Sequence, residues 1–389
     1  MFTHEAYDAL IVGARCAGAA TAMLMAQKGM RVLVIDRGGY GTDTISTHAL
    51  MRGGVLQLHR WGILPRLQEA GTPPVCETTF HYGEEAITVA IKPSSGVGAL
   101  YAPRRTLLDS TLVDVAREAG AIVRHGLTVV GLTHRSDGRV CGVSVLDAEG
   151  NTTRIEADLV VGADGASSSV ARLTGAETVH QARHTTAVIF GYFRGIGLTD
   201  YHWWYRSGIG AGAIPTNNGR HCVFAAVSPQ RLRNGQLHQD RAALFSEALC
   251  EAEPALAGLI AGAELDAPLC VFAGRKGFLR QAYGPGWALV GDAGYFKDPL
   301  TAHGITDAVR DAELLANATA AGAMAEYGAI RDDLSLPLFE VTDAIAALDW
   351  DLDHIKLLHQ RLNQAMKREV EHLLTLGDRH ATMNDEVVG

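Results

Sequence analysis

The sequence predicts an α/β fold in which a Rossmann-like nucleotide-binding domain carries an inserted antiparallel-sheet substrate domain and ends in a helical C-terminal segment. Three observations predict it. The N-terminus has the order of a βαβ unit, with a strand, a glycine loop, a helix and a second strand. Two later blocks alternate apolar and polar residues between turn residues, as antiparallel strands do. The last part of the chain shows helical spacing.

The βαβ unit begins with a strand at residues 7–12, and its glycine loop opens a helix at about residue 17. The loop holds Gly13 and Gly18, and the second strand ends on Asp36. In dinucleotide-binding folds the first glycine makes the turn, the helix N-terminus faces a pyrophosphate and the acid accepts ribose hydroxyls. Arg15 replaces the usual middle glycine, so its side chain either adds charge near the pyrophosphate or points outward.

Two further stretches place an acid at the end of an apolar strand. In the first, at residues 158–170, the strand ends in Gly162-Ala163-Asp164-Gly165, although an ordinary strand followed by a turn has the same pattern. The second, at residues 287–293, ends in Gly291-Asp292, and Gly304 follows it at the start of a helix. Ligands of such sheets bind at the carboxyl ends of the strands. A helix N-terminus there can meet an anionic ligand.

Together these stretches resemble the FAD fingerprint, the Asp-Gly motif and the Gly-Asp motif of the para-hydroxybenzoate hydroxylase superfamily, which includes geranylgeranyl reductases and flavin-dependent halogenases. An Arg-x-x-Leu-Asp element at Arg105–Asp109 fits the same family. The resemblance covers most of the chain up to about residue 320. It implies a Rossmann-like FAD-binding domain and FAD as the cofactor.

The resemblance also implies roles for single residues. Asp36 holds the adenosine ribose, Arg105 reaches the ribityl-pyrophosphate region, Val129 touches adenine through its backbone, and Asp292 meets the ribityl chain or the pyrophosphate. Asp164-Gly165 is tied to both FAD and the nicotinamide cofactor. The full set expected to bind the cofactor is Gly13, Arg15, Ala17, Gly18, Asp36, Arg37, Arg105, Val129, Asp164, Gly165, Gly291, Asp292, Gly304 and Ile305.

The predicted FAD-binding domain is discontinuous, comprising residues 1–75, 102–183 and 275–330. The substrate domain comprises residues 76–101 and 184–274, both of which are expected to be rich in strands. Residues 331–389 form the C-terminal helical segment, which either caps the pocket or forms a dimer face.

Three residues are candidates for catalysis: His48, His303 and Pro299. His48 lies in a segment that passes close to the flavin ring in such folds, and His303 and Pro299 precede Gly304. A histidine near the ring can act as acid, base or substrate anchor near neutral pH. The alternative is that His48 and His303 are structural histidines held by hydrogen bonds. Trp204 is the candidate for the substrate pocket, with a place in the core or an interface as the alternative.

Composition excludes several classes of protein. A net charge of -9 and a pI near 6.0 argue against a nucleic-acid binder, which needs a basic face. No secretory signal, membrane-spanning run or metal-binding spacing is evident, and the six cysteines are scattered. These features predict a cytoplasmic protein without a metal site. We expect it to be a monomer or a homodimer.

The leading functional hypothesis is a monooxygenase that oxygenates an apolar or aromatic small molecule with O2 through a flavin hydroperoxide. NADPH or NADH would supply the electrons, directly or through a separate flavin reductase. The alternatives are a reductase like the geranylgeranyl reductases and a flavin-binding protein without turnover. A halogenase is disfavoured because Ile214-Pro215 lacks the tryptophans of the Trp-x-Trp-x-Ile-Pro motif.

Overall fold

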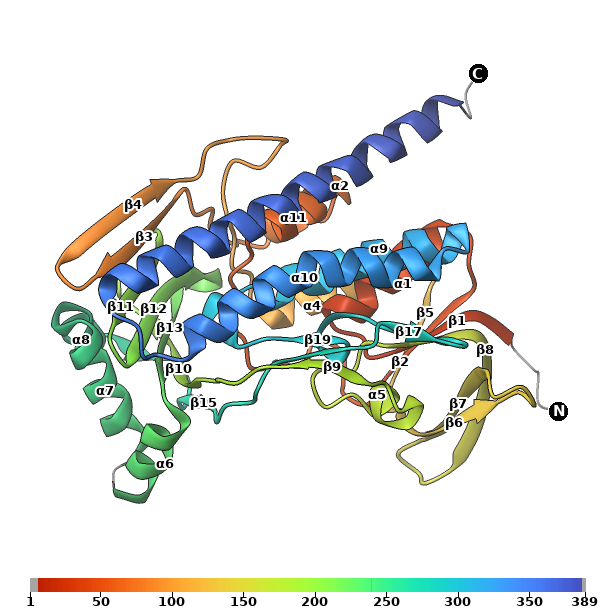
Figure 1. Ribbon diagram of the computed structural model, residues 1–389, viewed down its shortest axis with the longest axis horizontal. Coiled ribbons are helices and arrows are strands. Elements are labelled where there is room, and N and C mark those ends of the chain that lie inside the picture. Colours follow the sequence, from red (N-terminus) through yellow and green to blue (C-terminus); the bar gives the residue numbers. More distant parts are fainter. Residues whose placement is uncertain (1–5, 239, 387–389) are drawn as a thin grey trace.

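The computed structural model describes residues 6–238 and 240–386, and it confirms the predicted α/β architecture (Figure 1). The first sheet contains the N-terminal βαβ unit. The strand order is β17-β18-β8-β1-β2-β5, in which β18, β8, β1, β2 and β5 run parallel and β17 pairs antiparallel with β18. Their bounds are β17 Tyr283–Gly284, β18 Trp287–Leu289, β8 Thr152–Gly162, β1 Ala6–Val12, β2 Val32–Asp36 and β5 Ile122–His125.

Three helices pack on one face of this sheet: α1 (Cys16–Gln27), α4 (Arg105–Glu118) and α9 (Gly304–Ala321). Every residue of α1 from Cys16 to Met25 is buried, because its small side chains let it fit between the sheet, α4 and α9. The opposite face carries a separate apolar core. That core is built by the antiparallel strands β6 (Thr128–His134) and β7 (Val140–Leu146) and by helix α5 (Ser169–Thr174).

The second sheet is assembled from the two segments that the sequence assigned to the substrate domain. The strand order is β14-β10-β13-β12-β11-β3-β4, with β15 also paired to β10. All neighbours are antiparallel except β3 and β11. Their bounds are β3 Glu77–Tyr82, β4 Glu85–Ala90, β10 Ala187–Arg194, β11 Tyr201–Arg206, β12 Ile209–Thr216, β13 Arg220–Val227, β14 Glu264–Leu265 and β15 Cys270–Phe272.

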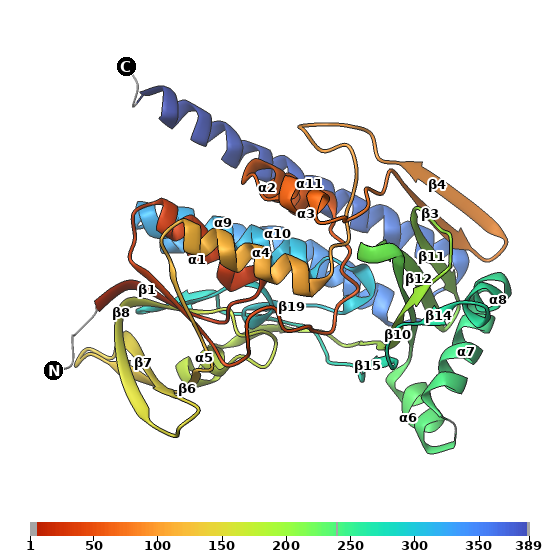
Figure 2. The same cartoon turned by 180° about the vertical axis from the view of Figure 1, so that it is seen from behind.

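The two faces of the second sheet belong to different cores. Tyr192 and Trp203 lie in the large core shared with the first sheet, whereas Phe193 and Trp204 lie in a smaller core under α7. Neighbouring residues of a strand point to opposite faces, which explains this division. The sequence analysis did not foresee the helices that cover the outer face, which Figure 2 shows at one end of the molecule. They are α6 (Pro229–His238), α7 (Arg241–Ala252) and α8 (Pro254–Ala261).

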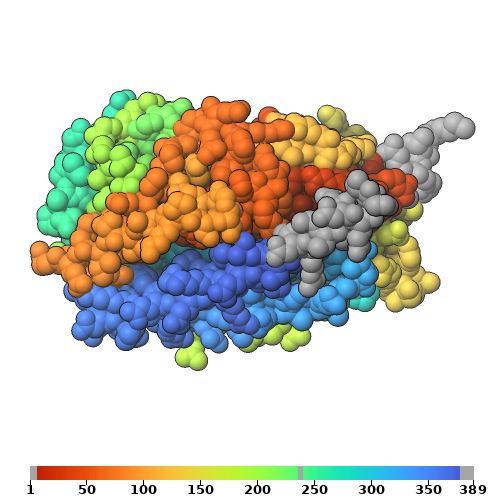
Figure 3. All heavy atoms as spheres, turned by 90° about the horizontal axis from the view of Figure 1, so that it is seen from above, coloured from red at the N-terminus to blue at the C-terminus, as the bar shows by residue number. Residues whose placement is uncertain are grey.

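The helical C-terminal segment extends along the whole molecule. Helix α10 (Met324–Ala346) packs on α9, and α11 (Leu352–Glu386) contacts α10, α2 (Arg52–Arg60) and β11. Figure 3 shows one side of α11 open on the surface, beside the orange segment that contains β4. A single helix therefore touches both the helices beside the first sheet and the second sheet. In the part of the chain that the structure describes, no helix is both long and apolar enough to span a bilayer.

The remaining elements connect these layers. They include a small sheet of β9, β16 and β19. Their bounds are α3 Leu64–Glu69, β9 Thr178–Gln181, β16 Phe278–Arg280, β19 Tyr295–Phe296, η1 Asn217–Gly219, η2 Gly291–Ala293 and η3 Pro299–Thr301. The predicted division into domains at particular residues stays a prediction.

Candidate functional site

The three glycine-bearing stretches converge at the carboxyl ends of the first sheet. Gly13 has φ +107°, and a Cβ at this position would overlap the carbonyl oxygen of Ala163, so the first stretch packs directly on the second. A Cβ at Gly291 would lie 3.0 Å from the Cβ of Ala17, so the third stretch packs on the first. Glycine is needed at both points because the backbone φ is positive and the space is filled.

A cleft opens beside this junction, lined among others by Ala14, Arg15, Asp36, Asp109 and His125. The carboxylate of Asp36 accepts hydrogen bonds from the backbone N–H of Ala14 and of Gly38, each at 2.6 Å. These bonds fix the acid at the end of β2. Within the described residues the buried Nε2 of His125 has no hydrogen-bond partner. A fixed acid and an unpaired buried nitrogen fit the polar adenosine end of FAD.

Arg15 lies at the rim of this cleft rather than in the sheet junction. It is the N-cap residue of α1, its guanidinium donates to the carbonyl oxygen of Asp43 at 3.2 Å, and its side chain is 38% exposed. Its Nη1 is 3.8 Å from a carboxylate oxygen of Asp109. Asp109 is also paired with Arg105 at 3.0 Å. These two residues are four apart on α4, the spacing at which side chains of a helix meet.

The remaining nucleotide-binding candidates lie in different environments. A Cβ at Gly18 would overlap the carbonyl oxygen of Gly13, so the turn at the start of α1 is closed tightly. Val129 is a buried residue of β6 paired with Val145. Arg37 is exposed just after β2. The proposed contacts of these residues with the cofactor stay predictions.

Asp164 is engaged within its own turn. Its carboxylate accepts hydrogen bonds from the hydroxyl of Ser168 and from the backbone N–H of Ser169 at 2.6 Å, at the start of α5. Burial raises its pKa, and the hydrogen bonds act in the opposite direction. Gly165 follows with φ +76°, which lets the chain turn back. These contacts explain the motif structurally and leave its proposed link to nucleotides untested.

The third stretch brings Asp292 to the start of α9. A Cβ at Gly304 would lie 3.9 Å from Oδ1 of Asp292, and Gly304 is exposed while Ile305 is buried. Burial raises the pKa of Asp292 to about 6, although Lys297 and Arg105 lower it. The free backbone N–H groups at this helix end attract anionic or electron-rich ligands.

His48 is held between the first and the second sheet. It is fully buried with φ +65°, and its Nε2 forms a short hydrogen bond with the hydroxyl of Tyr192 on β10. The guanidinium of Arg104 lies 3.5 Å from the centre of the Tyr192 ring and pairs with Asp43 at 2.6 Å. Burial, with Arg104 and Arg105 adding to it, lowers the pKa of His48 well below its ordinary value. The imidazole is therefore neutral at neutral pH. Sequence analysis did not identify Tyr192.

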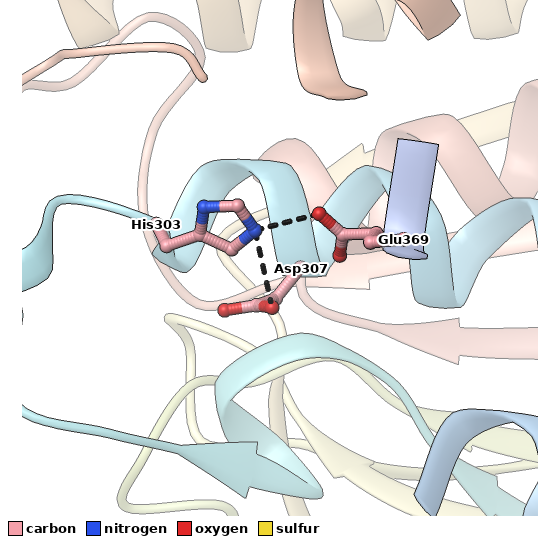
Figure 4. A group of neighbouring side chains, drawn as sticks. All are labelled: His303, Asp307 and Glu369. Atoms are coloured by element: carbon pink, nitrogen blue, oxygen red, sulfur yellow. Dashed lines mark hydrogen bonds and ion pairs between the residues drawn. The ribbon is translucent and has the colours of Figure 1, made fainter. Parts of the chain in front are cut away.

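His303 lies in a different environment, a buried network of charged side chains at the start of α9 (Figure 4). Its Nε2 is 2.7 Å from Oε2 of Glu369 and 4.0 Å from Oδ1 of Asp307. Arg310 donates to Glu369 at 2.8 Å and to Asp307 at 3.0 Å, and Lys297 pairs with the other oxygen of Asp307. Pro299, the remaining catalytic candidate, is half-buried at the start of η3.

The donor atoms of His303, Asp307 and Glu369 all lie within 4.8 Å of one another, which is close enough for a metal ion to bridge them. The carboxylates, however, are already paired with the buried cations Lys297 and Arg310. Buried charges need partners of opposite sign, and here the side chains supply them. The donor set therefore fits an ion-pair network.

Glu369 was not among the site residues predicted from the sequence, although its position on α11 indicates that it is buried. The buried face of α11 follows Ile355, Leu358, Leu362, Leu373 and Leu376 at spacings of three, four, eleven and three residues, and Glu369, seven residues after Leu362, falls on the same stripe. A charged residue on an apolar stripe indicates a buried partner.

Trp204 lies on the face of the second sheet that packs under α7. Its ring stacks on His81 at 4.8 Å and 7°, and its side chain belongs to the smaller core. Tyr192 and Trp203 are on the face toward the first sheet. The predicted pocket role of Trp204 stays a prediction.

Comparison with known proteins agrees with this geometry. The chain matches the family described as an FAD binding domain over residues 6–325. It is 29% identical over 348 residues to a menaquinone reductase of Mycolicibacterium smegmatis, covering 82% of this chain and 78% of that protein. It is 26% identical over 348 residues to digeranylgeranylglycerophospholipid reductase 1 of Methanococcoides burtonii, covering 85% and 77%.

The fold is also similar to that of a solved halogenase. The flavin-dependent brominase Bmp2 superposes with a TM-score of 0.77 at 18% identity, covering 96% of this chain and 94% of that one. The match extends over both sheets and the C-terminal helices. At this identity it concerns the fold alone.

Proposed function

This chain belongs to the FAD-dependent oxidoreductases that share the FAD binding domain, and from that premise we propose that it reduces an apolar, unsaturated small molecule with electrons from NADPH or NADH. Two of the relatives that match most of its length are named menaquinone reductase and digeranylgeranylglycerophospholipid reductase 1. The single observation that carries the proposal is the hydrogen-bonded pair of His48 and Tyr192 between the two sheets. Reduction of such a substrate needs a proton donor at a water-poor site.

The residues of the nucleotide-binding part suit the two ends of FAD. Asp36 and the turn at Gly13 would hold the adenosine, while Arg105 and Asp292 would lie near the pyrophosphate and ribityl chain. The N-terminus of α9, at Gly304, would face the flavin ring. When bound, FAD supplies hydride transfer and oxygen chemistry, and the protein orients the reactants.

Tyr192 is suited to donate the proton. Burial raises the pKa of its phenol, so the hydroxyl keeps its proton at neutral pH. His48, being neutral, can donate Nε2–H to the phenol oxygen, which leaves the phenol hydrogen free for the substrate. After that proton has left, the phenolate oxygen of Tyr192 would be stabilised by His48 and by the guanidinium of Arg104, which lies over the ring.

A monooxygenase that acts on an aromatic or apolar molecule with O2 is the second candidate function. The buried aromatic side chains Phe190, Tyr192 and Trp203 on the face toward the first sheet favour it. Apolar side chains beside a substrate exclude water and orient an aromatic ring, which oxygen transfer requires. The same His48 and Tyr192 would then handle the substrate's hydroxyl proton.

Rapid-mixing absorption spectroscopy separates these two candidates. FAD-loaded protein is reduced anaerobically with NADPH, or with NADH, and is then mixed either with a short-chain 1,4-naphthoquinone or with oxygenated buffer. Reoxidation by the quinone at least about tenfold faster than by oxygen is expected for a reductase. Faster reoxidation by oxygen, with product formation from an aromatic probe, supports the monooxygenase. Absence of reduction by either nucleotide contradicts direct use of NAD(P)H and points to a separate flavin reductase.

A further inference from the structure

We propose that Glu369, from the C-terminal helix α11, is a positioning residue that fixes the ring orientation and the proton of His303, leaving Nδ1 of His303 as the acceptor that meets a bound ligand. This inference rests on the proposed function and deepens it. It adds a second acid-base group, separate from His48 and Tyr192, at the helix end that is expected to face FAD. It also gives a role to the C-terminal helix, which the sequence left open between a cap and a dimer face.

The geometry of the pair carries the proposal. Nε2 of His303 lies 2.7 Å from Oε2 of Glu369, and both side chains are almost completely buried. Figure 4 shows that the other ring nitrogen points away from both Glu369 and Asp307. Among the described residues this Nδ1 has no hydrogen-bond partner although it is buried. A buried nitrogen without a partner is costly unless a ligand satisfies it.

The charge on Glu369 determines which nitrogen carries the proton. Burial tends to raise the pKa of Glu369, but the hydrogen bond from His303 and the cations Arg310 and Lys297 outweigh it and hold the pKa below its ordinary value. An ionised carboxylate only accepts hydrogen bonds, so Nε2 of His303 must be the N–H donor. Burial lowers the pKa of His303, against the attraction of Glu369, so the ring is neutral and Nδ1 carries a lone pair.

Buried charged side chains surround the ring of His303. Asp307 and Arg310 of α9, Lys297 before η3 and Glu369 of α11 face the ring. Arg310 also pairs with Asp311 of α9, and burial, with Arg310 adding to it, lowers the pKa of Lys297 to about 7. Nδ1 of the neutral ring would accept a hydrogen bond from a hydroxyl or an N–H group of the ligand.

The chain makes room for Glu369 at the junction of three helices. A Cβ at Gly53 of α2 would lie 3.3 Å from Oε2 of Glu369 and 3.2 Å from Cγ2 of Thr306 on α9. Glycine therefore allows α2 to approach both α9 and α11 closely. A carboxylate that orients a histidine through one nitrogen leaves the other free for chemistry, as in hydrolase triads and metal sites.

Nitrogen NMR of protein labelled with 15N in its histidines tests the assignment directly on the unmodified chain. The His303 signals are identified by their loss in His303→Gln. We expect Nε2 to be protonated and Nδ1 bare in the FAD-free protein, with the Nδ1 signal shifting when FAD alone is added. A proton on Nδ1, or an Nδ1 signal unchanged by FAD, would overturn the proposal. This measurement does not depend on any variant of Glu369 folding.

The matched variants are Glu369→Gln and Glu371→Gln, which make the same change of charge two positions apart on α11. Glu371 is exposed, so its variant should behave as the parent. Glu369→Gln should mix the two tautomers of His303 and slow turnover about 10- to 100-fold. It should also move the inflexion of the pH profile that belongs to His303 to lower pH, because loss of a nearby anion disfavours the protonated ring. A profile and a histidine spectrum identical to the parent's would contradict the assignment.

The two proposals fail separately in these experiments. A protein that reduces no naphthoquinone but shows the expected tautomer refutes the reductase and leaves the role of Glu369 in orienting His303 intact. A protein that reduces the quinone but carries the proton on Nδ1 refutes the role of Glu369 alone.

Discussion

The hydroxyl of Tyr192 is hydrogen-bonded to Nε2 of His48, although 144 residues separate them in the sequence. His48 comes from the loop that follows β2 in the nucleotide-binding part, and Tyr192 comes from the inner face of the second sheet. The contact joins the two sheets where the reactants of the proposed reaction would meet.

Replacement of Tyr192 by phenylalanine removes the proposed proton donor without changing the shape of the ring. We expect FAD content to be unchanged and substrate reduction to fall about 100-fold, within the usual range for loss of an acid-base group. Steady-state kinetics and the flavin absorbance of the purified protein measure the two quantities. Tyr205→Phe, on the same face of the sheet, is the control and should keep most of the activity. Equal activity of the two variants would remove Tyr192 from the mechanism.

Replacement of Gly13 by alanine should abolish FAD binding and destabilise the protein. The new Cβ would overlap the carbonyl oxygen of Ala163, in addition to the strain of a positive φ. Gly29→Ala is the matched control, because Gly29 has φ +82° with no atom within 4 Å of its Cβ position. The control should lose only about 1–2 kcal/mol in denaturant unfolding, with FAD content retained. A Gly13→Ala protein that retains FAD would contradict the packing of the first two stretches.

Asp292 should make the stability of the FAD-free protein depend on pH. Its folded-state pKa is raised from 3.8 to about 6, so its contribution to stability is present below about pH 4 and is lost as the pH rises through 6. Asp292→Asn should therefore raise the melting temperature at about pH 8, with a smaller gain near pH 5. Thermal unfolding followed by circular dichroism measures this difference. Asp349 is exposed, so the control Asp349→Asn should melt at the same temperature as the parent at both pH values. An equal rise in the melting temperature of Asp292→Asn at both pH values would show that the pKa of Asp292 is not raised.

Breaking the buried charge network should cost far more than breaking a surface ion pair. Arg310 is fully buried and pairs with Asp307, Asp311 and Glu369. Arg310→Met leaves these carboxylates short of a partner, so we expect a loss of about 3–5 kcal/mol in the free energy of unfolding. Arg117→Met, which breaks a surface pair with Asp114, should cost less than about 1 kcal/mol. Equal losses in urea denaturation would mean that the network relaxes or admits water.

The sequence by itself determined the nucleotide-binding part of the fold. The glycine loop after β1, the acid that ends β2 and the Gly-Asp pair after β18 are local patterns, because a turn, a helix start and a strand end depend on neighbouring residues. The alternation also predicted that residues 76–101 and 184–274 are rich in strands, and the second sheet confirms this. The helices α6 to α8 were missed because they lie among strong strand signals and their apolar residues do not stand out from them.

Only the tertiary structure decided which side chains meet. The partners of His48 and His303, Tyr192 and Glu369, come from segments that are 144 and 66 residues away. Their contacts follow from how the second sheet and α11 pack on the first sheet and its helices. Alternation along β11 places neighbouring aromatic side chains on opposite faces of the second sheet. Both faces are buried, so the sequence pattern does not tell which of these side chains faces the first sheet. Local patterns are set by nearest neighbours along the chain, whereas these pairs are set by the packing of whole layers.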